Sequence, residues 1–228
     1  MKDLLLQYMS QFPDEVKIDP VQQGPVITIS REYGCFGSGF ASELEARINK
    51  DFAPEKKWKT VDRHILANVS NVLHTEPSDI SHIFGAEQRS FIQDLVDSLS
   101  PKRYASDERV IATIKKVVRH FAEEGNTIIV GRAGCAISAS IRRSLHIRLI
   151  ASFEDRLSSV MEHTGLNEKE ARKQIETVSK KRSDFMKFYK GDKADSELFD
   201  VVYNKSKLDN ETIINSIIEL AKYKKILG

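Results

Sequence analysis

A glycine-rich loop between a predicted strand and a predicted helix is the strongest candidate for a binding site in this sequence. Glycine is scarce, with 11 in 228 residues, yet three glycines fall within six positions directly after the β-branched run at residues 26–30. Glycines let backbone N–H groups turn around a phosphate, and the N-terminus of the following helix adds a favourable dipole. We therefore expect the phosphates of a donor to contact Gly34, Cys35, Phe36, Gly37, Ser38 and Gly39.

The spacing of these glycines departs from two common nucleotide motifs. A dinucleotide fingerprint needs G-x-G-x-x-G, whereas this loop has G-x-x-G-x-G. A Walker A loop needs a lysine, and none lies between Ser30 and Arg47. A strand-to-helix turn without a ligand is the alternative interpretation. Ser38 is expected to bind phosphate or Mg²⁺, or to cap the helix, and the nearby helix N-terminus is expected to lower the pKa of Cys35.

Four arginines are candidates for contacting a transferred phosphate, namely Arg109, Arg132, Arg156 and Arg182. Catalysis of phosphoryl transfer needs positive charge around the transferred group, and the planar guanidinium suits phosphate well. Arg132 directly follows a buried strand, which favours a function. Acidic neighbours in the sequence give Arg156 an alternative role in an ion pair, and the basic run around Arg182 is typical of a solvated helix face.

Asp62 and Arg63 end the second predicted strand, where ligands are commonly bound in α/β proteins. An acid at this position would hold a ribose in a dinucleotide protein, or face the acceptor or a metal-bound water in a kinase. Capping the next helix is the alternative. The histidines lack metal-ligand spacing, and Cys35 and Cys135 alone support no zinc site, so we assign no metal ligands.

The charge balance argues against a protein that coats nucleic acid or a membrane surface. The net charge is only +2, but residues 101–148 carry ten Lys or Arg against four Asp or Glu, which fits capture of a small polyanion. No run approaches the roughly 18 apolar residues of a membrane span, and the N-terminus lacks the features of a signal peptide. With two cysteines only, a cytoplasmic location is expected.

The hydrophobic pattern predicts alternating strands and helices. Strands are expected at residues 26–30, 58–61, 127–130, 145–151 and 199–203, and helices at 3–11, 38–50, 107–124, 153–163, 167–189 and 210–223. The region 64–99 is also expected to be helical, with breaks. This alternation predicts an α/β fold with a mostly parallel sheet of about five strands and helices on both faces. Ligands should then bind at the carboxyl ends of the strands.

Several segments resemble the cytidylate kinase-like family. The resemblance begins with I-T-I-S-R-E-Y-G and the glycine-rich stretch, and continues with V-D-R-H-I-L, I-I-V-G-R-A and L-H-I-R-L-I-A-S-F-E-D-R. It ends with K-K-R-S-D-F, Y-K-G and F-D-V-V-Y-N-K-S-K-L, in the expected order. The resemblance implies a three-layer P-loop kinase fold over residues 25–228, preceded by a helix and connector at 1–24. It also implies an acceptor-binding insertion at about 64–105, a lid at about 167–195, and the use of ATP and Mg²⁺.

Within that family resemblance, individual residues take on expected roles. Asp62, Arg63, Arg109, Gly131, Arg132 and Ser179 would bind the acceptor, and Arg132, Arg156 and Arg182 would neutralise charge during transfer. Ser179 stands where cytidylate kinases have an Asp, and Val130 and Ala133 replace the acids that flank their Gly-Arg. The Walker lysine falls at Gly37, and Arg31 is the candidate to reach back into the loop in its place.

The leading hypothesis is an ATP-dependent phosphotransferase that acts on a nucleoside monophosphate or another small acceptor. Because the loop lysine is absent, the alternative is a catalytically impaired nucleotide or phosphoanion sensor on the same fold. A dinucleotide-dependent oxidoreductase is a more remote alternative, against which the glycine spacing speaks. A small-molecule nucleotide is the expected partner, and a homodimer is left open.

Overall fold

Five parallel strands form one sheet in the order β2-β3-β1-β4-β5. The structure is a computed structural model that describes residues 24–62, 115 and 118–228. β1 (Val26–Arg31) pairs with β3 (Thr127–Val130) on one side and with β4 (Ser144–Ile150) on the other. β2 (Lys59–Val61) and β5 (Val201–Asn204) form the two edges. β1 is thus the central strand, and its carboxyl end opens directly into the glycine-rich loop.

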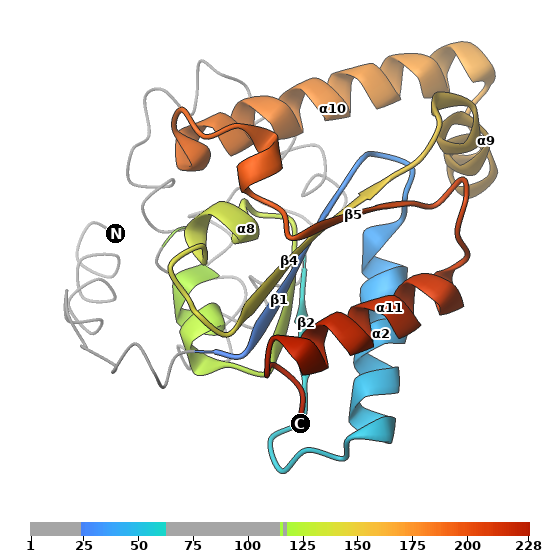
Figure 1. Cartoon of the computed structure of the whole chain (residues 1–228). Coiled ribbons are helices and arrows are strands. Elements are labelled where there is room, and N and C mark those ends of the chain that lie inside the picture. The colour runs from blue at the N-terminus through green and yellow to red at the C-terminus, as the bar shows by residue number, and fades with distance from the viewer. Residues whose placement is uncertain (1–23, 63–114, 116–117) are drawn as a thin grey trace, which may run out of the picture.

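Helices cover both faces of this sheet (Figure 1). α2 (Gly37–Asp51) and α11 (Asn210–Tyr223) lie side by side on one face, and α8 (Gly134–Ile137) and the helical residues 118–124 lie on the other. α9 (Phe153–Thr164) and α10 (Glu168–Lys190) pack against each other, and α10 runs across the carboxyl-end edge of the sheet (Figure 1). The 3-10 turn η1 (Asp195–Glu197) leads from α10 to β5.

The core forms between the sheet and the helices α2 and α11. Ile27 and Ile29 of β1 are fully buried, as are Phe40 and Leu44 of α2 and Ile217 of α11. Burying each such side chain contributes roughly 1.5–3 kcal/mol relative to leaving it exposed. The central strand is therefore a rigid support for the loop that follows it.

The expected α/β architecture with a five-stranded parallel sheet and helices on both faces is confirmed. The predicted strands and the helices at 38–50, 153–163, 167–189 and 210–223 occur within two residues of their expected bounds. α8 and η1 were not predicted, because three or four residues carry too little periodicity to detect. The predicted helix at 3–11, the insertion at about 64–105 and most of the first half of the helix at 107–124 lie outside the described residues.

A buried histidine joins β1 to β4. His146 Nδ1 and Thr28 Oγ1 share a hydrogen bond of 2.8 Å, and His146 Nε2 has no hydrogen-bond partner among the residues that the structure describes. Burial lowers the pKa of His146 to about 4, although Asp200 acts in the opposite direction. Asp200 itself accepts a hydrogen bond from the His146 backbone N–H and pairs with Lys224.

We predict that the folded protein loses stability as the pH falls from 6.5 toward 4. Because the unfolded chain binds a proton at His146 in this range and the folded chain does not, the free energy of unfolding should fall by about 2 kcal/mol between pH 7 and pH 5. Urea unfolding at both pH values measures this. His146→Gln should flatten the profile, and an unchanged difference between the two pH values in that variant would contradict the assignment to His146.

Candidate functional site

The glycine-rich loop joins the end of β1 to the first turn of α2. α2 begins at Gly37, and Phe36 occupies the cap position with a φ of 45° and without a side-chain cap. Ser38 is therefore inside the first turn and is not the cap residue, which leaves its predicted role in binding phosphate or Mg²⁺. Gly39 is exposed, and a methyl group there would meet nothing within 4 Å. The first turn of α2 is thus open at Gly39, whereas Gly37 in the same turn is buried.

Arg156 of α9 contacts the residues between β1 and the glycine-rich loop. Its Nε donates to the Ala151 carbonyl at 3.2 Å and lies 3.4 Å from Glu32 Oε2, and its Nη1 donates to the Tyr33 carbonyl at 3.5 Å. Gly34, with a φ of +98°, lies directly on Arg156. The acidic partner of Arg156 is therefore Glu32 at the end of β1, not an acid of its own helix. Its predicted role in catalysis stays a prediction.

Two further side chains from outside the loop hold it in place. The Phe36 ring, which is 40% exposed, stacks on the His163 ring of α9 with centroids 3.8 Å apart. Lys205 directly follows β5, and its Nζ donates to the Cys35 carbonyl at 3.1 Å. Lys205 was missed by the sequence interpretation, although its position after a parallel strand is the signal that singled out the other strand-end residues.

Cys35 does not have the lowered pKa that its place near a helix N-terminus suggested. Burial raises the pKa of the Cys35 thiol, and the neighbouring Glu32 raises it further, against the opposing effects of Lys205, Arg156 and Arg182. The expectation was wrong because the thiol points into the core, where the charged form is disfavoured. Cys35 is a packing residue of the loop with an unreactive thiol.

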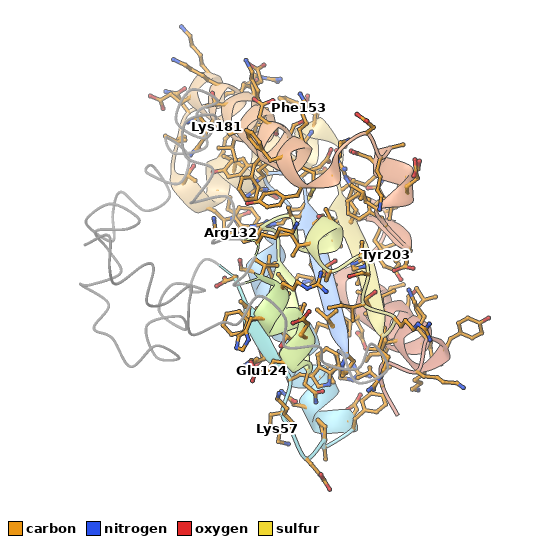
Figure 2. All side chains as sticks on the ribbon, turned by 90° about the vertical axis from the view of Figure 1, so that its left-hand side faces the viewer. Lys57, Glu124, Arg132, Phe153, Lys181 and Tyr203 are labelled. Atoms are coloured by element: carbon orange, nitrogen blue, oxygen red, sulfur yellow. The ribbon has the colours of Figure 1, made fainter. Side chains whose placement is uncertain are left out.

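A strained turn follows β3, the strand that pairs with β1 on the side of β2. Gly131, Arg132 and Ala133 all have positive φ values, of 75°, 55° and 53°. This conformation costs a non-glycine residue on the order of 1 kcal/mol or more, and such strain is often found at functional sites. The Gly131 N–H donates to the Ile29 carbonyl at 3.0 Å, which ties the turn to β1. The turn holds Arg132 at the edge of the sheet that α10 covers (Figure 2).

The Arg31 side chain connects the loop with this turn. Its Cγ and Cδ lie 3.1 Å from the position that a methyl group on Gly37 would occupy. Its Nη1 reaches Gly131, where a methyl group would collide with it. The guanidinium thus lies between the glycine-rich loop and the strand-end turn, and its contact with donor phosphates stays a prediction.

Arg182 connects α10 with the end of β1 at Arg31. Its Nη1 donates to the Arg31 carbonyl at 3.1 Å, and its guanidinium lies over the Tyr33 ring, 5.4 Å from the centroid. Burial lowers the pKa of Arg182 to about 10, and Arg132 lowers it as well, while Tyr33 and Cys35 act in the opposite direction. Arg182 is therefore not the solvated side chain that its basic sequence context suggested.

Like charges dominate the surroundings of Arg31. Burial lowers its pKa well below the usual value, and Arg182 and Arg132 lower it further, while Asp62 and Cys35 raise it. Asp62 is 9% exposed and directly follows β2, so its carboxylate acts on the same cluster from the far side of β3. Three guanidinium groups with one nearby carboxylate form a site suited to a phosphate or another compact anion.

Of the other predicted acceptor residues, Ser179 lies half-buried on α10, one helical turn from Arg182. Arg63 and Arg109 lie outside the described residues. The structure therefore brings together the glycine-rich loop with Arg31, Asp62, Gly131, Arg132 and Arg182. Arg156 instead contacts the residues that lead from β1 into the loop.

The comparisons with known proteins identify the family. The sequence profile of the cytidylate kinase-like family matches residues 26–207, from the start of β1 to the residues after β5. This chain belongs to the cytidylate kinase-like family. The resemblance found in the sequence is thereby confirmed. The matched range of this cytidylate kinase-like chain contains the loop, the strand-end turn and α10, so each element of the site falls within the family region.

Solved structures include one chain with the same fold and further matches of lower similarity. An uncharacterised protein from Eubacterium ventriosum superposes with a TM-score of 0.58 at 21% identity, covering 87% of this chain and 98% of that one. Shikimate kinase from Bacteroides thetaiotaomicron matches with a TM-score of 0.45 at 12% identity, covering 86% and 98%. Dephospho-CoA kinase from Campylobacter jejuni matches with a TM-score of 0.36 at 11% identity, covering 87% and 97%. No curated protein matches.

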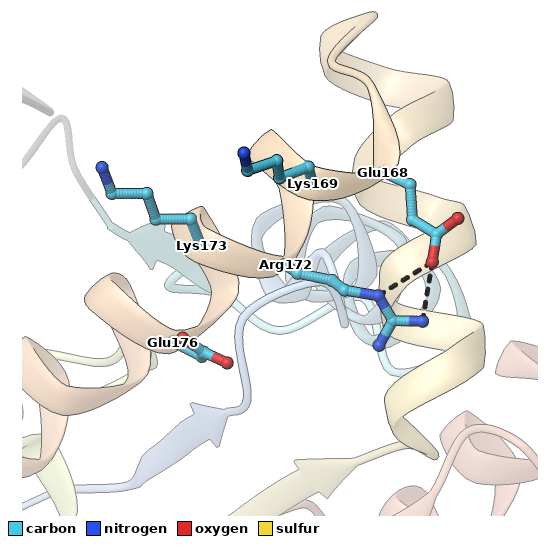
Figure 3. A pocket seen from close by; sticks show the side chains of 5 residues that line it. All are labelled: Glu168, Lys169, Arg172, Lys173 and Glu176. Carbon is cyan, nitrogen blue, oxygen red and sulfur yellow. Dashed lines mark hydrogen bonds and ion pairs between the residues drawn. The ribbon is translucent and has the colours of Figure 1, made fainter.

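A hollow on α10 is separate from the site. Its volume is about 410 Å³, and it is lined by Glu168, Lys169, Arg172, Lys173 and Glu176. Figure 3 shows Arg172 turned toward Glu168, with which it forms an ion pair of 2.8 Å. The hollow is flanked by solvated charges of a single helix.

Within the described ranges, no three His, Cys, Asp or Glu side chains gather as metal ligands, and none of the helices could span a membrane.

We predict that Gly34→Ala destabilises the protein more than Gly165→Ala does. Both glycines have positive φ values, but a methyl group at Gly34 would lie 2.8–3.0 Å from Arg156, whereas one at Gly165 meets nothing within 4 Å. Gly165→Ala should cost about 1 kcal/mol, from the backbone conformation alone, and Gly34→Ala about 2–4 kcal/mol. Urea unfolding of the two variants measures the difference. Equal losses would show that Arg156 does not constrain the loop.

Proposed function

We propose that this cytidylate kinase-like protein is a nucleotide-binding phosphotransferase that transfers the γ-phosphoryl group of ATP to a nucleoside monophosphate or another small acceptor. The observation that carries the proposal is the convergence of Arg31, Arg132 and Arg182 between the glycine-rich loop and Asp62. A γ-phosphoryl group in transfer spreads its negative charge over three oxygens, and catalysis consists largely of positioning and stabilising that charge.

The residues divide into a donor side and an acceptor side. The loop from Gly34 to Gly39 would hold the donor phosphates through its backbone N–H groups. Arg132, Arg156 and Arg182 would neutralise charge as the phosphoryl group moves, and Arg156 would also hold the loop in place. The acceptor would be oriented by Asp62, Arg63, Arg109, Gly131, Arg132 and Ser179.

The nucleotide would bring Mg²⁺ with it. Mg²⁺ keeps several waters and is held through one or two protein oxygens together with substrate phosphates, so it does not need a cluster of ligands in the protein. Ser38 in the first turn of α2 and the Asp62 carboxylate are two oxygen ligands at this edge of the sheet that would support it. When bound, the ion would offset charge on the donor phosphates.

The domain assignment and the cellular location are further parts of the proposal. Residues 25–228 would form the kinase-like domain, with the segment at about 64–105 contacting the acceptor and the segment at about 167–195, which contains α10, acting as a lid. Both Cys35 and Cys135 are free thiols in the core, which is compatible with a reducing cytoplasm.

The second candidate function is a nucleotide or phosphoanion sensor without turnover. It is favoured by Gly37, which stands where the family resemblance places a loop lysine. A sensor would show a ligand-dependent rise in melting temperature and no ADP release. The same experiment therefore separates the two functions.

We predict that the wild-type protein binds MgATP and releases ADP in the presence of one or more nucleoside monophosphates. Calorimetry gives the affinity, and a coupled ADP-release assay over a panel of monophosphates gives turnover. Because Arg132 would make charge-assisted contacts with phosphate, Arg132→Met should lose roughly 10- to 100-fold in acceptor-dependent turnover. Binding without turnover for any acceptor would support the sensor, and absence of nucleotide binding would exclude both.

Arg142→Met is the matched control. Arg142 is an exposed arginine just before β4, at the amino end of the strands and thus at the opposite edge of the sheet from the site. The control removes the same charge from the same segment of the chain, between β3 and β4. Equal losses in the two variants would show that Arg132 acts only through the overall charge of the protein.

A further inference from the structure

Arg31 takes an unusual path for a residue at the end of a buried strand. Its backbone continues β1, and its side chain crosses the first turn of α2 at Gly37 before its guanidinium reaches the turn after β3 at Gly131. The guanidinium therefore lies on the line from the donor loop to the predicted acceptor residues. In the proposed function, the transferred phosphoryl group would pass through this region.

Two glycines make room for that path. At Gly37 a methyl group would lie 3.1 Å from both Cγ and Cδ of Arg31, which is tighter than ordinary van der Waals contact. At Gly131 a methyl group would overlap Nη1. A methyl group at Gly131 would displace the Arg31 guanidinium, and one at Gly37 would require the Arg31 side chain to shift by a few tenths of an ångström. The glycine at the place of the loop lysine thus leaves room for a cation from the end of β1.

The charges around Arg31 favour an anion at its guanidinium. Burial lowers the pKa of Arg31 most, Arg182 and Arg132 lower it further against the opposing effect of Asp62, and Arg182 approaches closely enough to donate to the Arg31 carbonyl. Arginine nevertheless stays protonated in proteins, so the cluster retains its positive charges and their mutual repulsion. An anion with several oxygens would relieve that repulsion by accepting hydrogen bonds from more than one guanidinium.

We propose that Arg31 is the cation that contacts the transferring γ-phosphoryl group, in place of a lysine on the first turn of α2. The proposal rests on the proposed function and assigns one residue within its site. In the transfer step, an acceptor oxygen forms a bond to the γ-phosphorus while the bond from that phosphorus to the β,γ-bridging oxygen breaks, and the electron pair leaves with ADP. Arg31 donates hydrogen bonds to the γ-phosphoryl oxygens throughout and transfers no proton.

The experiment compares ATP with ADP, because only ATP carries the group that Arg31 is proposed to contact. Calorimetry of both nucleotides with Mg²⁺ is carried out on the wild type, Arg31→Met, Arg31→Lys and the control Arg142→Met. Arg31→Met should weaken ATP binding roughly 10- to 100-fold and ADP binding less than about 3-fold. Arg31→Lys should recover part of the ATP affinity, since it keeps the charge and loses the planar fork. Arg142→Met should change neither affinity.

A second variant guards against a simple loss of folding. Gly131→Ala keeps Arg31 but places a methyl group where its guanidinium lies, so it should reduce ATP affinity selectively in the same way. Gly165→Ala is the control for the cost of a positive φ without a neighbour. Urea midpoints of all variants show whether the fold is retained at the temperature of the binding measurement.

The outcomes distinguish a failure of the Arg31 assignment from a failure of the proposed function. Selective loss of ATP affinity in both Arg31→Met and Gly131→Ala supports the assignment. If the wild type binds ATP and Arg31→Met binds ATP and ADP like the wild type, the assignment is overturned and the proposed function stands. If Arg31→Met weakens ATP and ADP equally, Arg31 supports the loop and does not contact the γ-phosphoryl group. If the wild type binds neither nucleotide, the proposed function fails and the assignment fails with it.

Discussion

Repulsion among three guanidinium groups is the interaction on which this end of the molecule depends. Arg31 leaves the central strand, Arg132 follows β3, and Arg182 comes from α10, so three separate elements must hold like charges together. The attachments that resist this repulsion are a buried sheet, a strained turn after β3, and the hydrogen bond from Arg182 to the Arg31 carbonyl. Positive charge fixed in position before a ligand arrives costs little reorganisation when an anion binds.

The cations around the loop have two different roles. Arg156 and Lys205 donate hydrogen bonds to backbone carbonyls in the loop and in the residues next to it, and Arg156 also pairs with Glu32. These two side chains hold the backbone of the loop in position. Arg31 reaches toward the turn after β3 that contains Arg132, where the acceptor residues are predicted. The loop is held in this way although Phe36, a residue with a bulky side chain, occupies a backbone conformation that favours glycine.

Much of the fold could be predicted from sequence, because each strand of a parallel sheet is a short buried apolar run and each long helix has a clear apolar face. The rule that ligands bind at carboxyl ends of strands singled out Asp62, Gly131 and Arg132, and the structure places all three around Arg31. The other features of the site depend on tertiary contacts, which the sequence pattern does not show. The pairing of Arg156 with Glu32 joins residues far apart in the sequence, and the thiol of Cys35 titrates according to its burial and not its distance from a helix end. The route of Arg31 depends on two glycines in different loops, which no local pattern reveals.

A methyl group at Gly37 would lie 3.1 Å from Cγ and Cδ of Arg31, so a side chain at position 37 and the Arg31 side chain compete for the same space. Arg31 enters this space from the strand, whereas a lysine at position 37 would enter it from the helix. Gly37→Lys alone would require Arg31 to shift, and shortening Arg31 alone would leave neither long side chain there. Positions 31 and 37 are therefore coupled, and the effect of a substitution at one depends on the residue at the other.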